Sequence, residues 1–394
     1  MVGQTAQNSN TLYAPKFVDD WEEQFLYSLS DWVNGMAFKD FNFTPKGKPV
    51  IKITEIKNGI SNQTKFTDGH YDEIYLIKRG DMLFCWSGQP ETSIDIFWWN
   101  GPEGWLNQHI FKVTPKIKNK LFFFYLLKYL KPNFVQIAVN KQTTGLGHVT
   151  KGDLERFIVK LPSSEEQRAI SAVLSSLDDK IELLREQNKT LAATAQAIFK
   201  EWFVNFNFPS ATGKMTDSEL GEIPEGWKVD RFGNELKIEY GKSDKRLDDD
   251  GIYPVYGAGG IIGFSNSADY KDYQVIVGCR GTCGNITLAY DDSKITHNSL
   301  VISNSWPKPF IYLFLHSVNI ARAITGSTQP QITIGDLGNI EIVIPPKDIV
   351  RDFSVSISSI FQKIKNNNSQ IQTLSKLRDS LLPKLMSGKI RIKI

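Results

Sequence analysis

One glycine-rich stretch of this chain could bind a cofactor if its spacing were right. Gly257-Ala-Gly259-Gly-Ile-Ile-Gly263 approaches the glycine pattern of loops that bind a dinucleotide or a methyl donor. However, the third glycine comes one position too late, Pro254 lies close before the stretch, and no helical pattern follows it. We therefore interpret the stretch as a turn. Glycine would still let the backbone of such a turn come close to a phosphate.

Two other patterns only superficially indicate chemistry. Gly241-Lys-Ser243 looks like the end of a phosphate-binding loop, but the first glycine of that loop would fall at Leu236. Cys279 and Cys283, with His297 downstream, lack the second Cys/His pair of a zinc site. No Asn-Pro-Pro-Tyr motif for adenine methylation occurs, and nothing supports a catalytic triad. The sequence thus predicts no catalytic residue, no cofactor of its own and no metal.

The composition is that of an ordinary globular protein. The 394 residues carry a net charge of +3, which is too small to indicate nucleic-acid binding by itself. Three cysteines give no even set for disulfides, which fits a reducing cytosol. The first ten residues are polar and lack the apolar core of a signal peptide. Leu121–Leu130, the most apolar stretch, is too short to span a membrane. We expect a cytoplasmic protein with no membrane contact.

The elements that must position any site are duplicated. The motif Val149-Thr-x-Gly-Asp-Leu154 recurs as Ile332-Thr-x-Gly-Asp-Leu337, 183 residues later. Upstream, Trp21 and Gly35 match Trp227 and Gly241 at an offset of 206, so the first half carries 23 additional residues. The aspartate of each motif suits a helix cap or a turn better than a catalytic role.

Each half reads as a mixed, mainly β unit with a few helices. Val50–Ile56 and Glu341–Ile344 alternate as strands do, and Leu121–Leu130 and Phe310–Val318 read as short apolar helices. Abundant aromatic residues suit such β-rich cores. The predicted fold class is therefore α+β.

Each half ends in a long segment with heptad spacing. Apolar or neutral residues recur at alternating steps of four and three, which is typical of a coiled coil. Arg378 interrupts the second stripe, and we expect its neighbour Leu377 to take its place. The residues expected to pair are Ile170, Leu177, Ile181, Leu184, Asn188 and Leu191 of the first segment and Ile364, Asn367, Ile371, Leu374 and Leu381 of the second.

The two segments can pair with each other in antiparallel register. Setting Asn188 against Asn367 also sets Ile170 against Leu385 and Ile181 against Leu374. Two facing amides would satisfy each other and fix the register. The result would be a pseudo-two-fold molecule with its globular units at opposite ends of a rod of roughly 50 Å. Alternatively, each helix packs on its own domain or on another subunit.

Several stretches are similar to the specificity subunit of type I restriction–modification systems. Leu161-Pro-Ser-Ser-Glu-Glu-Gln-Arg-Ala-Ile170, with Leu177–Ile181 and Phe199–Phe203, resembles the central helical region of that family. Leu220–Trp227 looks like the entry into a second target-recognition domain, and Leu381–Lys389 like the C-terminal segment. The resemblance covers nearly the whole chain. The expected domains are two target-recognition domains, 1–160 and 211–345, and two helical spacers, 161–210 and 346–394.

The resemblance implies a function without catalysis. Each target-recognition domain would read one half of a split, asymmetric site on double-stranded DNA. The paired helices would set the gap and dock two methyltransferase (modification) subunits. S-adenosylmethionine and ATP would then bind to the partners, namely to the methyltransferase subunits and to the motor–nuclease (restriction) subunits. The host would be bacterial or archaeal.

The residues expected to meet DNA are basic and polar side chains in loop-like stretches. Lysine and arginine suit phosphates, and arginine, glutamine or threonine suit base edges. In the first unit they are Lys46, Lys48, Lys52, Lys57, Asn62, Lys65, Lys78, Arg79, Lys141, Gln142 and Thr143. In the second unit they are Lys242, Lys245, Arg246, Arg280, Arg322, Thr328 and Gln329.

Two other classes of function stay open at the level of sequence. One is a stand-alone methyltransferase or nuclease with DNA-reading domains fused on, against which the missing motifs speak. The other is a coiled-coil scaffold that binds only proteins.

Overall fold

The computed structural model describes residues 15–142, 145–248 and 250–393. The chain forms two units. Unit 1 comprises Met1–Ile181 and Gln372–Ile394, and unit 2 comprises Glu182–Ile371. The two long helices α5 (Ser164–Phe203) and α9 (Lys347–Met386) have 40 residues each. Each unit therefore contains one half of both helices.

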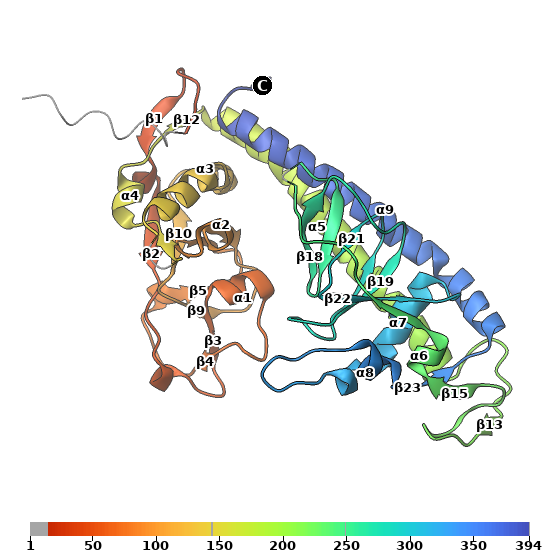
Figure 1. Ribbon diagram of the computed structural model, residues 1–394. Coiled ribbons are helices and arrows are strands. Elements are labelled where there is room, and N and C mark those ends of the chain that lie inside the picture. The colour runs from red at the N-terminus through yellow and green to blue at the C-terminus, as the bar shows by residue number, and fades with distance from the viewer. Residues whose placement is uncertain (1–14, 143–144, 249, 394) are drawn as a thin grey trace, which may run out of the picture. The chain divides into compact units, whose positions relative to one another are not determined.

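Unit 1 is built on an antiparallel sheet in the order β2-β10-β6-β8 and a second sheet in the order β4-β3-β9-β5 (Figure 1). Its strands are β1 (Glu22–Phe25), β2 (Ser30–Asn34), β3 (Lys48–Ile51), β4 (Phe66–Thr67), β5 (Leu76–Ile77), β6 (Met82–Cys85), β7 (Ser87–Gly88), β8 (Asp95–Trp98), β9 (Gly104–Leu106), β10 (Ile110–Pro115), β11 (Gly147–His148) and β12 (Ile158–Leu161). Its shorter helices are α1 (Ile53–Asn58), α2 (Pro90–Ser93), α3 (Lys120–Asn140) and α4 (Lys151–Glu155), with 3-10 turns at Leu26–Leu29, Asp40–Asn42 and Glu73–Tyr75.

Unit 2 repeats this plan with an antiparallel sheet β16-β22-β19-β20 and a smaller sheet β18-β17-β21. Its strands are β13 (Met215–Thr216), β14 (Ile223–Pro224), β15 (Lys228–Arg231), β16 (Lys237–Tyr240), β17 (Tyr253–Gly257), β18 (Gly260–Ser265), β19 (Gln274–Gly278), β20 (Ile286–Ala289), β21 (Lys294–Ile295), β22 (Ser299–Ser303) and β23 (Glu341–Ile344). Its shorter helices are α6 (Phe232–Glu235), α7 (Lys308–Ser317) and α8 (Ile334–Gly338), with a 3-10 turn at Ile320–Ala323.

The predicted duplication and the α+β class are confirmed. In each unit the second sheet contains one parallel pair, β3 with β9 in unit 1 and β17 with β21 in unit 2. The repeated motif forms the same short helix twice, α4 and α8. In both helices the aspartate, Asp153 or Asp336, exchanges hydrogen bonds with the preceding threonine in a capping box. These carboxylates therefore act as helix caps, as expected.

One strand prediction was wrong. Val50–Ile56 does not continue as a strand, because β3 ends at Ile51 and α1 begins at Ile53. The carboxylate of Glu55 accepts a hydrogen bond from the Lys52 backbone N–H at 3.1 Å, which caps the first turn of α1. Ile53 and Ile56 then pack together against the buried cluster around Ile51, since residues three apart share a helix face.

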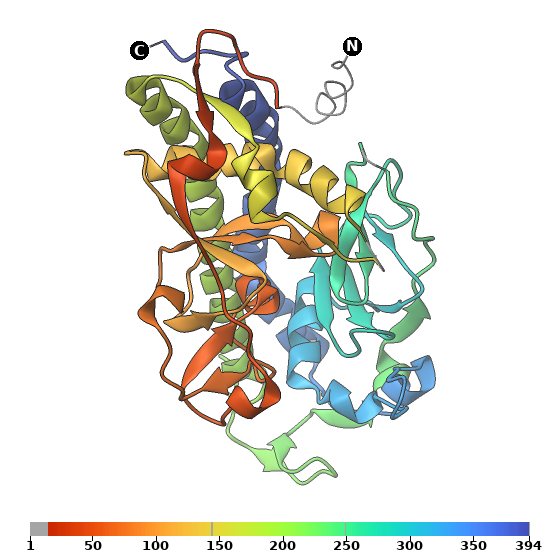
Figure 2. The same ribbon diagram turned by 90° about the vertical axis from the view of Figure 1, so that its left-hand side faces the viewer.

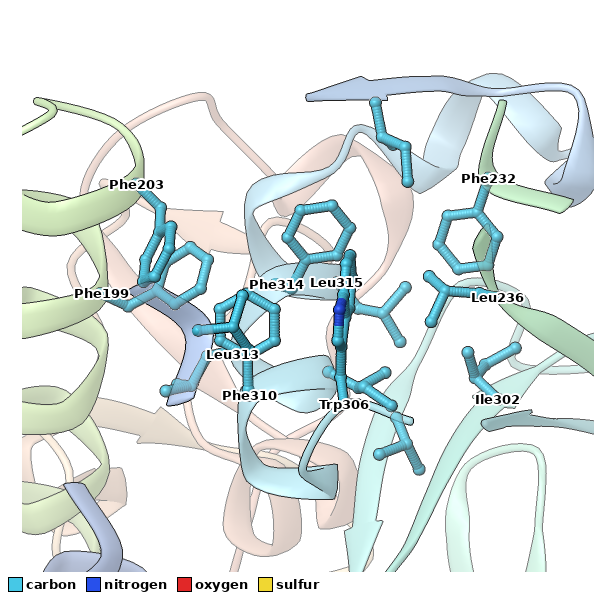
Figure 3. Close-up of a cluster of buried hydrophobic side chains, with 14 of the residues drawn as sticks. Phe199, Phe203, Phe232, Leu236, Ile302, Trp306, Phe310, Leu313, Phe314 and Leu315 are labelled. Atoms are coloured by element: carbon cyan, nitrogen blue, oxygen red, sulfur yellow. The ribbon is translucent and has the colours of Figure 1, made fainter. Parts of the chain in front are cut away.

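Aromatic side chains join the helices to the sheet in unit 2. Figure 3 shows Phe199 and Phe203 of α5 close to Phe310 of α7, with Trp306 and Phe314 beside them. The Phe203 and Phe310 rings lie 5.1 Å apart in an edge-to-face arrangement. The half of α5 that belongs to unit 2 is therefore part of its hydrophobic core.

The two long helices run antiparallel within each unit, and Figures 1 and 2 both show them side by side. In unit 2, Asn367 Nδ2 donates to Asn188 Oδ1 at 2.9 Å, and Trp202 of α5 contacts Phe353 of α9. Asn188 Nδ2 in turn donates to Asn368 Oδ1 at 2.8 Å. In unit 1, Ile170 and Leu385 share one buried cluster. This is the register in which Asn188 faces Asn367.

The expected replacement of Arg378 by Leu377 was wrong. Leu377 stays 44% exposed, and Arg378 keeps its place against α5 by donating to Asp178 Oδ1 at 2.7 Å. Asp178 Oδ2 also accepts from the Tyr125 hydroxyl of α3 at 2.7 Å. Burial and the nearby Asp178 raise the pKa of Tyr125, so the phenol stays a donor. A cation is tolerated in the stripe because its charge is paired there.

The matching positions of unit 2 are apolar. Phe361 and Ala195 stand 183 residues from Asp178 and Arg378, and Phe361 contacts Tyr312. Beyond the end of α9, Arg391 lies over the ring of Trp21 and forms an ion pair with Glu166, whereas Phe208 stacks on Trp227 in unit 2. Unit 1 therefore has polar and charged contacts at positions where unit 2 has aromatic contacts.

We expect Asn188→Ala to lower the free energy of unfolding by about 1–3 kcal/mol, because the fully buried Asn367 amide then loses its closest acceptor. Urea unfolding followed by circular dichroism measures this loss. Arg185→Ala is the control, since Arg185 is an exposed residue of the same helix and should cost less than about 0.5 kcal/mol. Equal stabilities of the two variants would show that the amide contact does not hold the helices in register.

Candidate nucleic-acid interface

The basic candidates of unit 1 gather around β3 and β4. Lys46 lies in the turn before β3, Lys48 begins that strand, and the Lys65 carbonyl accepts from the Val50 backbone N–H at 2.8 Å. Lys48 and Lys78 both pair with Glu103, at 3.1 and 3.5 Å. By contrast, Lys46, Lys65 and Arg79 are exposed, and no carboxylate of the described residues lies within ion-pair distance of them.

Other candidates of unit 1 are held within the fold or lie elsewhere. Lys52 caps α1 and lies over the Phe43 ring, and Lys57 donates to the Thr92 carbonyl. Lys141 donates to both carboxylate oxygens of Asp153, and Gln142 donates to the Gly145 carbonyl at 2.7 Å. Asn62 is exposed, and Thr143 lies outside the described residues.

In unit 2 the structure brings Arg280 beside the loop that carries Thr328 and Gln329. Arg280 forms a backbone bridge with Gln331, and Thr325 and Gln331 close the loop by two hydrogen bonds of 2.9 Å. The Arg280 guanidinium lies over the Tyr240 ring at 5.9 Å. All three predicted side chains of this group are exposed.

The remaining candidates of unit 2 form a second group. Lys242 lies over the Tyr270 ring at 5.8 Å, and Arg246 is 4.0 Å from Asp244. Lys245 is exposed on the same segment, which leads to β17. Arg322 lies in the 3-10 turn after α7.

The patterns that superficially resemble chemical motifs have structural roles. Gly257 and Gly260 face each other across the tight turn between β17 and β18. Gly241-Lys-Ser243 follows strand β16, and the Ser243 hydroxyl donates to Asp269 at 2.7 Å. The Cys283 thiol donates to the Pro330 carbonyl at 2.9 Å. Among the described residues, no group of three or more His, Cys, Asp or Glu side chains could hold a metal ion.

Both units carry the same cluster of three loops, which we call the three-loop cluster. In unit 1 it consists of 86–88, 107–109 and 145–148, and in unit 2 of 279–281, 296–298 and 325–331. The Val149 N–H donates to the Trp86 carbonyl, and the Trp86 N–H to the His109 carbonyl. The Ile332 N–H donates in the same way to the Cys279 carbonyl, and the Cys279 N–H to the Asn298 carbonyl.

The repeated glycines explain why these loops are held so closely. A Cβ atom on Gly35 would lie 2.1 Å from the Asn107 carbonyl oxygen, and one on Gly241 would lie 2.3 Å from the Thr296 carbonyl oxygen. Only glycine allows this approach of β2 or β16 to the loop before β10 or β22. The marker found in the sequence thus lies at the three-loop cluster in both units.

Sequence reasoning predicted Arg280, Thr328 and Gln329 of this cluster but missed other side chains that it presents. Gln108 and His109 of unit 1 and His297 of unit 2 are exposed there. A search for lysine and arginine could not find them. The repeated Gly35 and Gly241, placed against these loops, are the signal that points to them.

Within the described part of the chain, every helix is too short or too polar to cross a membrane.

A duplicated α+β chain whose halves share one backbone scaffold, and carry different side chains on it, is a protein with two related recognition domains. This chain belongs to the family of the type I restriction modification DNA specificity domain, whose model matches residues 18–193 and 224–378. The resemblance noted in the sequence is confirmed. The chain is therefore a specificity subunit that recognises a DNA target in a type I restriction–modification system.

Relatives match along nearly their whole length. The type I restriction enzyme MjaIX specificity subunit of Methanocaldococcus jannaschii is 27% identical, over 92% of this chain and 98% of its own. The HindI specificity subunit of Haemophilus influenzae is 22% identical, over 95% and 100%. The crystal structure of the type I restriction–modification S subunit from M. genitalium shares the fold, with a TM-score of 0.51 at 18% identity over 97% of this chain and 100% of that one.

The Asp153 cap predicts a pH-dependent stability of unit 1. Burial by itself would raise the pKa of this carboxyl, but hydrogen bonds from Lys141 and Thr150 outweigh burial and lower the pKa below 3.8. The ionised carboxylate therefore stabilises the fold above about pH 4, and this contribution is lost as the pH falls through the lowered native pKa.

We expect Asp153→Asn to destabilise the protein by about 1–3 kcal/mol at neutral pH and to make its stability fall less steeply below about pH 4. Thermal unfolding at a series of pH values measures both effects. Glu155→Gln, an exposed change on the same helix, should leave the loss of stability at acid pH unchanged. An Asp153→Asn profile parallel to that of the wild type would contradict this assignment.

Proposed function

We propose that the chain recognises a split, asymmetric site on double-stranded DNA, with one half-site read by each unit. The observation that carries this proposal is the three-loop cluster. The same backbone hydrogen bonds hold it in both units, yet Ser87 and Gln108 of unit 1 stand where Arg280 and His297 stand in unit 2. Different donors and acceptors on one scaffold favour two different base sequences.

The basic groups suit a role in positioning the DNA. Lys46, Lys65 and Arg79 of unit 1 and Lys245 of unit 2 are exposed and unpaired among the described residues, so their charges are available to phosphates. Candidates that already form an ion pair, such as Lys48 with Glu103, would have to exchange their carboxylate partner for a phosphate.

We further propose that the helix pair docks two methyltransferase subunits and that the chain itself has no catalytic activity. Leu183 of α5 and Val355 and Leu377 of α9 are 51%, 69% and 44% exposed. Apolar side chains left open on a helix pair suit docking of partner helices. S-adenosylmethionine would then bind to those partners, and ATP to motor–nuclease subunits.

Methylation mapping of host DNA tests this proposal directly. The modified adenines are mapped in a host with the intact system and in one from which this chain is deleted. We expect a split motif with two unlike halves and a fixed gap, present only with the chain. A continuous or palindromic motif, or methylation that persists after deletion, would overturn the proposal.

Arg280→Ala should reduce discrimination at the second half-site and leave the preference for the first half-site intact. The guanidinium is exposed over Tyr240, and a lost base contact costs about 1–3 kcal/mol. This loss of discrimination is measured by the methylation of target variants in which one base is changed at a time. Arg231→Ala, an exposed arginine on β15, is the control. An equal loss for all targets would instead assign Arg280 to a phosphate.

A further inference from the structure

We infer that the three-loop cluster is the surface that reads base edges and that Gln108 is its adenine-reading side chain in unit 1. This inference rests on the proposed function and deepens it. It starts from the position of Gln108 on the loop between β9 and β10, directly before His109, whose carbonyl holds the Trp86 backbone.

A series of side-chain contacts connects Gln108 to strand β2. The Trp86 indole N–H donates to Asn34 Oδ1 at 2.8 Å, which fixes the indole on β2. The His109 ring meets this indole edge to face at 5.8 Å. Gln108 Nε2 lies 3.3 Å from His109 Nε2. The exposed amide is therefore held by partners that are themselves held by a strand.

The contact with His109 leaves the hydrogen-bonding groups that adenine requires. A glutamine amide has two N–H donors and one carbonyl acceptor. When one N–H donates to His109, one N–H and the carbonyl oxygen stay available. Adenine offers the matching pair in the major groove, the N7 acceptor and the N6 amino donor. Guanine offers two acceptors there, so the same amide cannot satisfy both of its positions.

The same backbone positions in unit 2 carry other chemistry. His297 stands at the position of Gln108, Asn298 at that of His109, and Arg280 at that of Ser87. Arginine pairs with the two acceptors of guanine. The two clusters therefore favour different bases, and His297 is the residue of unit 2 that corresponds to Gln108.

The test uses the intact system in its host, with the chain replaced by Gln108→Ala. The mapped target is presented with each base of the first half-site changed in turn, and the methylated fraction is measured. We expect methylation of the original target to fall about tenfold and discrimination to be lost at one position, an adenine in the wild-type motif. Gln108→Glu should move that preference toward cytosine, whose amino group donates a hydrogen bond to a carboxylate.

Two controls keep the outcome specific. Gln24→Ala, a change on β1 outside the cluster, should leave the motif unchanged. Unchanged discrimination at the second half-site shows that the Gln108 variant is folded and assembled. His297→Ala should instead abolish discrimination at one position of the second half-site and leave the first half-site unchanged.

Three results would overturn the inference. Gln108→Ala could leave the split motif unchanged, which refutes the role of Gln108 while the proposed function stands. It could lower methylation equally on all targets, which assigns the loop to positioning. Finally, a wild-type system without a split motif would refute the proposed function itself, and this inference with it.

Discussion

The amide contact of Asn188 with Asn367 and Asn368 is the constraint on which the rest of the structure depends. In an α-helix a shift by one residue turns each side chain by about 100° about the axis. Any other register would therefore take Arg378 away from Asp178 and Phe353 away from Trp202. Apolar stripes alone tolerate such shifts, whereas the buried Asn367 amide does not, because another register would take away the Asn188 acceptor of its N–H group.

Much of this architecture could be predicted from the sequence, because it is written in local patterns. The repeat, the capped helices at Asp153 and Asp336, and the heptad stripe all depend on neighbouring residues. The predictions failed where a distant partner decides the outcome. Arg378 stays in the stripe because it pairs with Asp178, which also accepts from Tyr125. The residues around Leu377 in the sequence do not indicate these partners.

The loops that carry the candidate interface were even harder to predict, because their partners are also distant in the sequence. Trp86, His109 and Val149 come from three separate parts of the chain, and backbone hydrogen bonds bring them together. Such bonds do not depend on side-chain identity, so the sequence is free to vary at Trp86 and His109, where unit 2 has Cys279 and Asn298, and gives no motif there. For these two loops the space requirement persists, and it is visible in the sequence as a glycine at positions 35 and 241.

The different contacts that join each globular unit to its helix halves restrict how such genes can exchange parts. In unit 1 the Tyr125 hydroxyl of α3 donates to the Asp178 carboxylate of α5, whereas in unit 2 Tyr312 of α7 contacts the ring of Phe361 of α9. The globular part of unit 1, moved alone onto the half-helices of unit 2, would meet Phe361 in place of Asp178 and would leave the buried Tyr125 hydroxyl without its acceptor. Recombination that preserves folding must therefore carry the adjoining half-helices along, so that its junctions fall inside α5 and α9. New specificities would then arise by shuffling pieces that begin and end within helices rather than at domain borders.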